Sequence, residues 1–135
     1  MMNEPISSIM NTDVVTVTPD DTLAHALSLF LEKKIQHIPA VVGPKMVGIL
    51  SKTDLLKFLL HHSIEQTEST KVNDVMTKKV AFLEREDHIG AASEVFMEHL
   101  FHAIPVCKDD HVLVGLVTSF DLLAYSYSKE YPPRD

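Results

Sequence analysis

The alternation of hydrophobic and polar positions predicts short strands and amphipathic helices. The β-branched run at residues 14–17 predicts a strand that Pro19 interrupts. A helix follows, with Asp20 or Asp21 as its expected N-cap and Lys33 near its end. Its buried face holds Leu23, Ala26, Leu27, Phe30 and Leu31 at helical spacing. Residues 35–42 and 46–50 predict two more strands around a turn, and an apolar helix comes next.

The same order of elements returns after residues 62–71, which are polar and predict a linker. Residues 80–83 predict a strand and Asp87 the N-cap of a helix. The inward face of that helix consists of Ile89, Ala92, Phe96 and Leu100. Matching positions lie 66 residues apart up to Pro39 and Pro105, and 67 apart from Gly48 and Gly115 onward. One residue is therefore inserted in the turn at 108–111, and residues 125–135 predict a fraying polar tail.

The most similar stretch of the two copies is a strand-to-helix corner. Gly48 to Asp54 returns as Gly115 to Asp121, and each ends with a hydroxyl residue, two further positions and an aspartate. The first turn of a helix has unpaired N–H groups and the positive end of the helix dipole, so it binds anions and hydroxyls. The same residues fit a capping box, in which the two side chains hydrogen-bond only to backbone N–H groups at the helix N-terminus. Both interpretations are open for one corner alone.

The composition argues against several classes of protein. The net charge of -7, without a basic cluster, argues against binding to nucleic acid. No apolar run is long enough for a membrane span and residues 1–10 do not resemble a signal peptide, so we expect a cytoplasmic protein. The single cysteine, Cys107, excludes an intramolecular disulfide.

The candidate chemistry outside the corners is weak. His99 and His102, or the pair His61-His62, are more typical of surface histidines than of a metal site, so we expect no metal. With only 4 glycines, the chain has no phosphate-binding loop and no nucleophile elbow. We therefore expect no catalytic residues and no enzyme activity.

The tandem pattern resembles the CBS domain, named after cystathionine β-synthase, and two such domains resemble a Bateman module. The features that carry the resemblance are a Met near the start of each copy, an Ile-Pro before the second strand and Gly-x-x-[Ser/Thr]-x-x-Asp before the last helix. The resemblance implies an α/β (α+β) fold of tandem pseudo-twofold repeats, each strand-helix-strand-strand-helix, packed sheet to sheet. We assign repeat 1 to residues 5–62, a linker to 63–71, repeat 2 to 72–127 and a flexible tail to 128–135.

The resemblance also implies two clefts that hold adenosine-containing ligands, namely AMP as the favoured ligand, or ADP, ATP or S-adenosylmethionine. It implies that Asp54 and Asp121 accept hydrogen bonds from the ribose hydroxyls. It also implies that Ser51 and Thr118 bind the ribose or phosphate. One expected cleft comprises Ile49, Ser51, Lys52, Asp54, Lys79, Val80, Ala81, Phe101, His102 and Ile104. The other comprises Leu116, Thr118, Asp121, Asp13, Val14, Val15, Ile35, Gln36 and Ile38. Because both copies keep the corner next to an apolar Ile-Pro wall, the duplication favours ligand binding over simple capping.

Three further expectations concern affinity and partners. The cleft with Ser51 should bind phosphorylated ligands more tightly, since Lys52 and Lys79 lie in it, whereas the other has Asp13 and Ser119. We expect a homodimer through the apolar helices after the corners, together with an unknown target protein. The alternative to a ligand sensor is an oligomerisation scaffold that binds no nucleotide.

Overall fold

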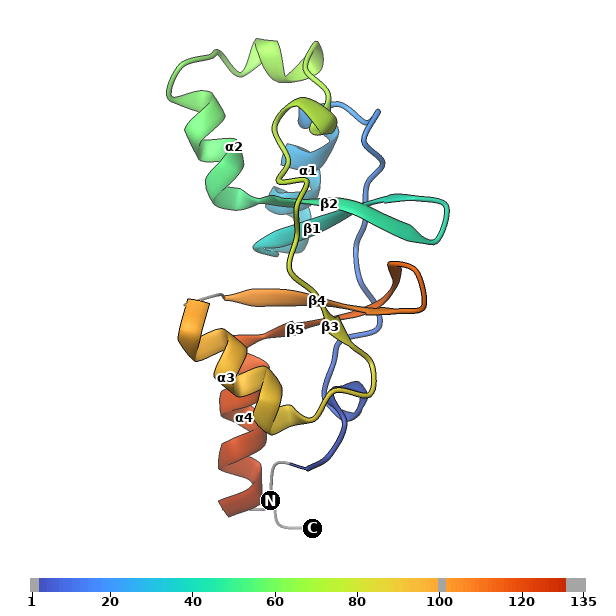
Figure 1. The fold of residues 1–135 in the computed structure, drawn as a ribbon. Coiled ribbons are helices and arrows are strands. Elements are labelled where there is room, and N and C mark those ends of the chain that lie inside the picture. The colour runs from blue at the N-terminus through green and yellow to red at the C-terminus, as the bar shows by residue number, and fades with distance from the viewer. Residues whose placement is uncertain (1–2, 100–101, 131–135) are drawn as a thin grey trace. The chain divides into compact units, whose positions relative to one another are not determined.

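The computed structural model describes residues 3–99 and 102–130, which fold as mixed helices and strands (Figure 1). The chain forms two compact units. Unit 1 consists of Met1–Asp13 with Ala81–Asp135, and unit 2 consists of Val14–Val80. The mixed fold and the tandem order of elements confirm the predicted fold class.

Unit 2 contains α1 (Leu23–Lys33), β1 (His37–Val42), β2 (Lys45–Ser51) and α2 (Lys52–Leu59). Two 3-10 helices follow, η2 (Glu65–Glu68) and η3 (Val72–Asp74). β1 and β2 are antiparallel, with Pro39 opposite Ile49. Their inward side chains pack with α1 in a core whose fully buried members include Leu23, Ile38, Leu50 and Val72.

Unit 1 contains η1 (Ile6–Ser8), β3 (Leu83–Glu84), α3 (Ile89–His99), β4 (Ala103–Lys108), β5 (Val112–Thr118) and α4 (Ser119–Glu130). β4 pairs antiparallel with β5 and parallel with β3. The core includes Ile6, Ile89, Ile104, Val106 and Val117. The two units thus bury apolar side chains at matching positions of the repeat.

The predicted insertion is confirmed by the hairpins. β1 ends at Val42 and β2 begins at Lys45, whereas β4 ends at Lys108 and β5 begins at Val112. Gly43 takes the left-handed conformation in the shorter turn, with φ 60. The longer turn has two left-handed residues, Asp109 and His111. The extra residue lies in the turn, so the paired strands keep their lengths of 6 and 7 residues in both copies.

The segment that begins each repeat lies in the unit of the other repeat. In unit 1, the amide of Ile6 donates to the carbonyl of Asp87 at 2.7 Å, and that of Ile89 to Glu4 at 2.9 Å. In unit 2, the matching bonds run from Val72 to Asp21 and from Leu23 to Thr70, both at 2.8 Å. The two lead-in segments are therefore exchanged between the repeats.

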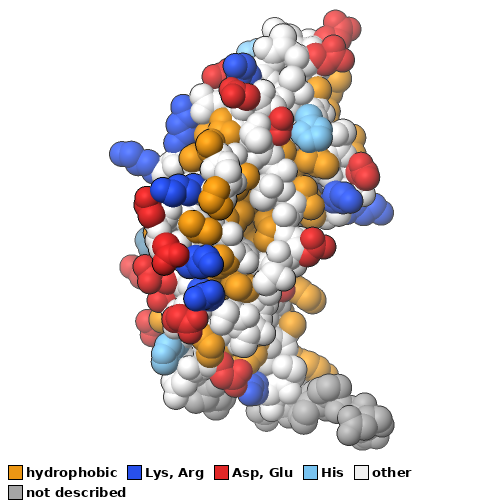
Figure 2. Space-filling view, turned by 90° about the vertical axis from the view of Figure 1, so that its right-hand side faces the viewer, with side chains coloured by type: hydrophobic (Ala, Val, Ile, Leu, Met, Phe, Trp, Pro, Cys, Tyr) orange, Lys and Arg blue, Asp and Glu red, His pale blue; other side chains and the backbone are white. Residues whose placement is uncertain are grey.

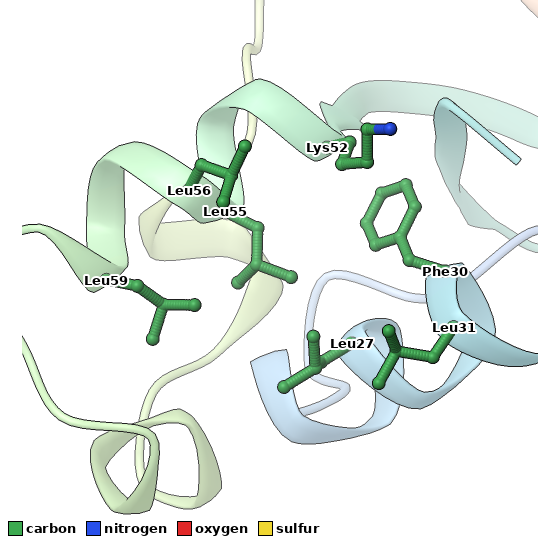
Figure 3. A pocket seen from close by; sticks show the side chains of 7 residues that line it. All are labelled: Leu27, Phe30, Leu31, Lys52, Leu55, Leu56 and Leu59. Atoms are coloured by element: carbon green, nitrogen blue, oxygen red, sulfur yellow. The ribbon is translucent and has the colours of Figure 1, made fainter. Parts of the chain in front are cut away.

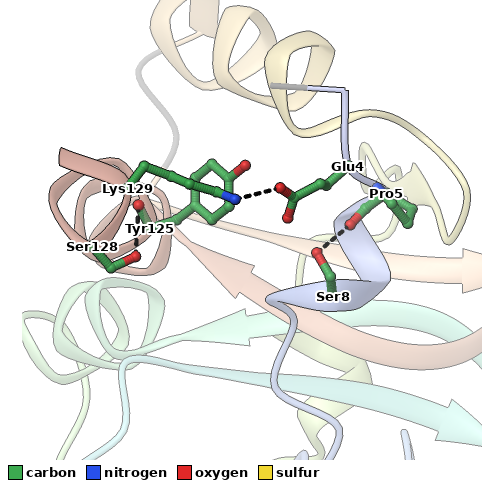
Figure 4. A network of polar contacts seen from close by, with 6 residues as sticks. All are labelled: Glu4, Pro5, Ser8, Tyr125, Ser128 and Lys129. Carbon is green, nitrogen blue, oxygen red and sulfur yellow. Dashed lines mark hydrogen bonds and ion pairs between the residues drawn. The ribbon is translucent and has the colours of Figure 1, made fainter. Parts of the chain in front are cut away.

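An ion pair holds the N-terminal segment on α4 (Figure 4). Lys129 Nζ lies 2.6 Å from Glu4 Oε1 and 5.4 Å from the centre of the Tyr125 ring. The hydrogen bond from Lys129 lowers the pKa of Glu4 below its ordinary value, and the same bond raises the pKa of Lys129. Burial, followed by the nearby Glu4, raises the pKa of Tyr125.

Several expected assignments were wrong in detail. Leu31, expected on the buried face of α1, is 71% exposed, and of residues 80–83 only Leu83 lies in a strand, β3. Of residues 14–17 only Val17 pairs, through bonds to Pro39 and Val41 on β1. The N-cap of α1 is Thr22, whose Oγ1 accepts from the amide of His25 at 3.1 Å.

The aspartates expected as caps close turns before the helices instead. The carboxylate of Asp21 accepts from the amide of Thr18 at 2.8 Å, and that of Asp87 from Glu84 at 2.9 Å. Each bond joins the aspartate to the amide three residues earlier in the chain. Asp21 and Asp87 lie two positions before the first helical residue, so they precede the N-cap position.

The expected linker and tail both contain ordered helix. Residues 65–68 form η2, where Thr67 is 1% exposed and donates to the carbonyl of Ile64 at 2.6 Å, which satisfies its hydroxyl. α4 extends to Glu130, into the range expected to be a tail. Its residue Tyr125 is 8% exposed and packs into the core of unit 1. Leu100 and residues 131–135 lie outside the described residues.

Candidate functional site

The corner of unit 2 joins β2 to α2 at Ser51. Ser51 Oγ accepts a hydrogen bond from the amide of Asp54 at 3.0 Å, and Asp54 Oδ2 accepts one from the amide of Ser51 at 3.0 Å. These two bonds form a capping box. Both side chains are partly exposed, so the corner is open to solvent.

The corner of unit 1 repeats this geometry at the end of β5. Thr118 Oγ1 accepts from the amide of Asp121 at 3.1 Å, and Asp121 Oδ2 accepts from the amide of Thr118 at 2.8 Å. A carboxylate has two oxygens and about four acceptor positions, so one capping bond leaves it able to accept others. Each corner therefore combines a helix N-terminus, a hydroxyl and an acceptor-only group that a vicinal diol could bind.

A short backbone bridge supports each corner strand from within its own unit. Ile49 exchanges two bonds of 2.9 Å with Thr77, and Leu116 exchanges two of 2.9 Å with Asn11. Thr77 and Asn11 were not among the predicted site residues. The repeat offered a signal for them, because Met10-Asn11 and Met76-Thr77 occupy matching positions.

The glycine of the motif is required by this close approach. A Cβ at Gly48 would lie 2.5 Å from Met76 Sδ and 2.9 Å from the carbonyl oxygen of Thr77. A Cβ at Gly115 would lie 2.6 Å from Met10 Sδ and 3.1 Å from the carbonyl oxygen of Asn11. The glycines thus let a second chain segment pack across the strand just before the corner.

Two of the predicted site residues contact the corner of their own unit. The amide of Lys52 donates to the carbonyl of Gln36 at 2.9 Å in unit 2. In unit 1 the amide of Ser119 donates to the carbonyl of His102 at 2.9 Å. The two expected clefts, one with Gln36 near Thr118 and the other with His102 near Ser51, each combine residues of both units. These clefts stay predictions.

The other predicted site residues differ in accessibility. Ile38 and Ile104 are 0% and 1% exposed and belong to the cores of their units. Unit 2 contains the predicted residues Val14, Val15, Ile35, Gln36, Ile38, Ile49, Ser51, Lys52, Asp54, Lys79 and Val80. Unit 1 contains Asp13, Ala81, His102, Ile104, Leu116, Thr118 and Asp121. Phe101 lies outside the described residues.

Charges and possible metal ligands add little to the site. On the face shown in Figure 2, Lys and Arg side chains are interspersed with Asp and Glu. Within residues 3–99 and 102–130, no three His, Cys, Asp or Glu side chains gather as a metal site would require. Burial raises the pKa of the Cys107 thiol, which lies in β4. In the described part of the chain, no helix has the length and apolar character needed to cross a membrane.

Comparison with known families identifies the repeat. The family model described as the CBS domain matches residues 6–61 and 72–128. The chain therefore belongs to the CBS domain family and contains two copies of the domain, which confirms the resemblance drawn from the sequence.

The curated relatives are larger proteins. A homoserine O-acetyltransferase of Methanosarcina acetivorans is 26% identical over 120 residues, which cover 88% of this chain and 21% of that enzyme. An inosine-5′-monophosphate dehydrogenase of Korarchaeum cryptofilum is 31% identical over 123 residues, which cover 91% of this chain and 24% of that enzyme. The chain thus spans less than a quarter of the length of these two enzymes.

Solved structures with the same fold are similar to this chain over nearly their whole length. The CBS-pair protein CBSX2 from Arabidopsis thaliana, in complex with AMP, has a TM-score of 0.83 and 24% identity, covering 94% of this chain and 98% of that one. A CBS domain pair in complex with 5′-methylthioadenosine and S-adenosyl-L-methionine has a TM-score of 0.80 and 21% identity, covering 93% and 97%. At these identities the likeness shows the fold.

Proposed function

We propose that this chain is a regulatory module that binds an adenosine-containing ligand and signals to a partner protein. The observation that carries the proposal is a pair of corners with the same geometry, Ser51 with Asp54 and Thr118 with Asp121. The CBS pairs in complex with AMP and with S-adenosyl-L-methionine support it, because both ligands contain adenosine. AMP is the favoured ligand, with ADP, ATP and S-adenosylmethionine as the other members of the class.

In this proposal each corner holds the ribose and phosphate. Asp54 and Asp121 accept hydrogen bonds from the ribose hydroxyls through the acceptor positions that capping does not use. Ser51 and Thr118 bind ribose or phosphate, and the N-termini of α2 and α4 favour the negative charge.

The proposed role is regulatory and not catalytic. The two enzymes related to this chain share with it only 21% and 24% of their own length, so their chemistry gives no argument for catalysis here. We propose that the module acts in the cytoplasm as a homodimer and through a target protein.

The two sites are proposed to differ in affinity. Lys52 follows Ser51, whereas Ser119 follows Thr118, so only the first corner has a lysine beside the helix N-terminus. Lys79 would add a second cation to that site, while Asp13 would oppose a phosphate at the other. A charge-assisted hydrogen bond contributes about 1.5 to 3 kcal/mol, so one extra bond makes the first site about tenfold tighter or more.

Calorimetric titration with AMP tests this proposal. Asn can accept the same capping bond as Asp, so Asp54→Asn and Asp121→Asn remove the charge and keep the box. We expect Asp54→Asn to weaken the tighter event about tenfold or more, and Asp121→Asn to weaken only the second. The control is Thr22→Ala, which removes the cap of α1 at a residue outside the predicted sites and should leave AMP binding unchanged.

A scaffold without nucleotide binding is the second candidate function. It is favoured by the capping boxes themselves, since capping alone explains why each corner has a hydroxyl and a carboxylate. Unaltered thermal stability of the wild-type protein with AMP, ADP, ATP and S-adenosylmethionine would support the scaffold, because a ligand that binds the native state raises apparent stability. Loss of the tighter event in Asp121→Asn alone would reverse the proposed ranking.

A further inference from the structure

Unit 2 has an apolar groove of about 260 Å³ between α1 and α2 (Figure 3). Its apolar lining consists of Leu27, Phe30 and Leu31 of α1 and Leu55, Leu56 and Leu59 of α2. The seventh lining residue, Lys52, lies at one end beside Phe30, and Leu59 lies at the other end. Lys52 and Leu59 are seven residues apart on α2, which is about 10 Å along a helix axis. The groove is therefore elongated and apolar, with one cation at its end.

The matching helix pair of unit 1 differs at three of the seven lining positions, and each difference is a serine. The matched pairs are Leu27 with Ser93, Lys52 with Ser119, and Leu59 with Ser126. Ser93 and Ser126 each donate to a backbone carbonyl of their own helix at 3.0 Å, so serine is well accommodated there. The fold of the repeat therefore does not require the two leucines or the lysine. We attribute them to a role that belongs to unit 2.

The ammonium group of Lys52 is available to an anion. Lys52 is exposed and forms no ion pair with any residue that the structure describes. It is also the first residue of α2, where the positive end of the helix dipole adds to its charge. Apolar walls with one well-placed charged group are typical of sites for small molecules. The charge selects an anion, and the leucines select an apolar chain.

We propose that this groove binds a free linear acyl carboxylate, with the carboxylate beside Lys52 and the chain among the leucines. The volume of the groove holds about nine groups the size of a water molecule in the liquid. A methylene is of similar size, so an acid of about eight carbons fits. The inference does not rest on nucleotide binding. Lys52 is also proposed to bind a phosphate at the first corner, so the two ligands would compete for it and the test is made without nucleotide.

Methyl NMR spectra of leucine-labelled protein, titrated with octanoate, test the proposal. We expect saturable shifts of the signals of Leu27, Leu55 and Leu56, and no shift at Leu123 of unit 1. Hexanoate should bind about fifteenfold more weakly, because each of its two missing methylenes weakens binding about fourfold. Octylamine, which has the same chain length and the opposite charge, should bind more weakly than octanoate because Lys52 repels it.

Serine variants at exposed positions test the two parts of the groove. Lys52→Ser, which copies Ser119 of unit 1, should weaken octanoate binding about fivefold, as expected for an exposed ion pair. Leu56→Ser should weaken it about tenfold through lost apolar contact. Leu123→Ser is the matched control, since it makes the same change at the corresponding position of unit 1. Leu56 and Leu123 are 58% and 69% exposed, so both variants should fold, and Leu123→Ser should bind as wild type does.

Three results would overturn the proposal. Equal affinities for octanoate and octylamine, or shifts that do not saturate, would show that the carboxylate is not recognised. Equal weakening in Leu56→Ser and Leu123→Ser would show unspecific adsorption to apolar surface. Groove signals that change on dilution of the protein but not with octanoate would show that a second copy of the chain covers the groove.

Discussion

At the residue scale, the glycine before each corner matters because it has no side chain. Gly48 and Gly115 lie on β2 and β5 where another segment of the same unit crosses the strand. Neither has the positive φ that favours glycine, in contrast to Gly43. Their role is therefore steric and not conformational.

Gly48→Ala should destabilise the protein by about 1 to 3 kcal/mol, because the added Cβ would overlap Met76 Sδ and the backbone of Thr77. Gly115→Ala should cost less, since its nearest backbone oxygen is 3.1 Å away and not 2.9 Å. Urea unfolding measures both. Gly43→Ala is the control, since nothing lies within 4 Å of its Cβ and its cost is only that of a left-handed alanine, about 1 kcal/mol. Equal costs at Gly48 and Gly43 would contradict the steric explanation.

At the element scale, the N-terminal segment is held on unit 1 by both apolar and polar contacts. Ile6 is fully buried in the core, and Glu4 pairs with Lys129 near the end of α4. The ion pair is the part of this attachment that responds to pH.

Acid should weaken the attachment. The pKa of Glu4 is lower in the folded protein, mainly through its hydrogen bond from Lys129. The pair therefore adds stability above the pKa of Glu4 in the unfolded chain, and this contribution is lost as pH falls through the lowered pKa. Urea unfolding across the acid range should show a weaker pH dependence for Lys129→Met than for wild type. Glu4→Gln should behave like Lys129→Met, and parallel pH profiles for all three proteins would exclude the effect.

At the scale of the whole molecule, the compact units do not follow the order of the repeats along the chain. Residues 1–13 belong with 81–135, while the lead-in of the second repeat belongs with 14–80. A change near the N-terminus should therefore act on distant sequence.

Ile6→Ala should cost about 2 to 5 kcal/mol, since it removes a fully buried side chain from the core of unit 1. Hydrogen exchange measured by mass spectrometry should increase within residues 81–130 more than within 14–80. Val72→Ala is the matched variant, because Val72 is fully buried in unit 2, and it should loosen 14–80 instead. An increase confined to residues 14–62 in Ile6→Ala would mean that each lead-in stabilises its own repeat.

The sequence alone determined the features that depend on local pattern and on repetition. The helical spacing from Leu23 to Leu31 predicted α1, and the offsets of 66 and 67 predicted the longer turn before Val112. The corner residues Ser51 and Asp54 were found because a capping box depends on residues three positions apart.

Only the tertiary structure decided which distant segments meet. Residues 14–17 are β-branched, as is typical of a strand. A strand needs a pairing partner along its length, however, and only Val17 has one. The caps were misassigned because Asp21 and Thr22 are both suitable, and backbone geometry chose between them. The exchange of lead-in segments left no local signal, since Ile6 reads as an ordinary apolar residue until its partner Asp87, far along the chain, is known. Contacts between residues so far apart depend on how the whole chain buries its apolar surface, and no local pattern contains that information.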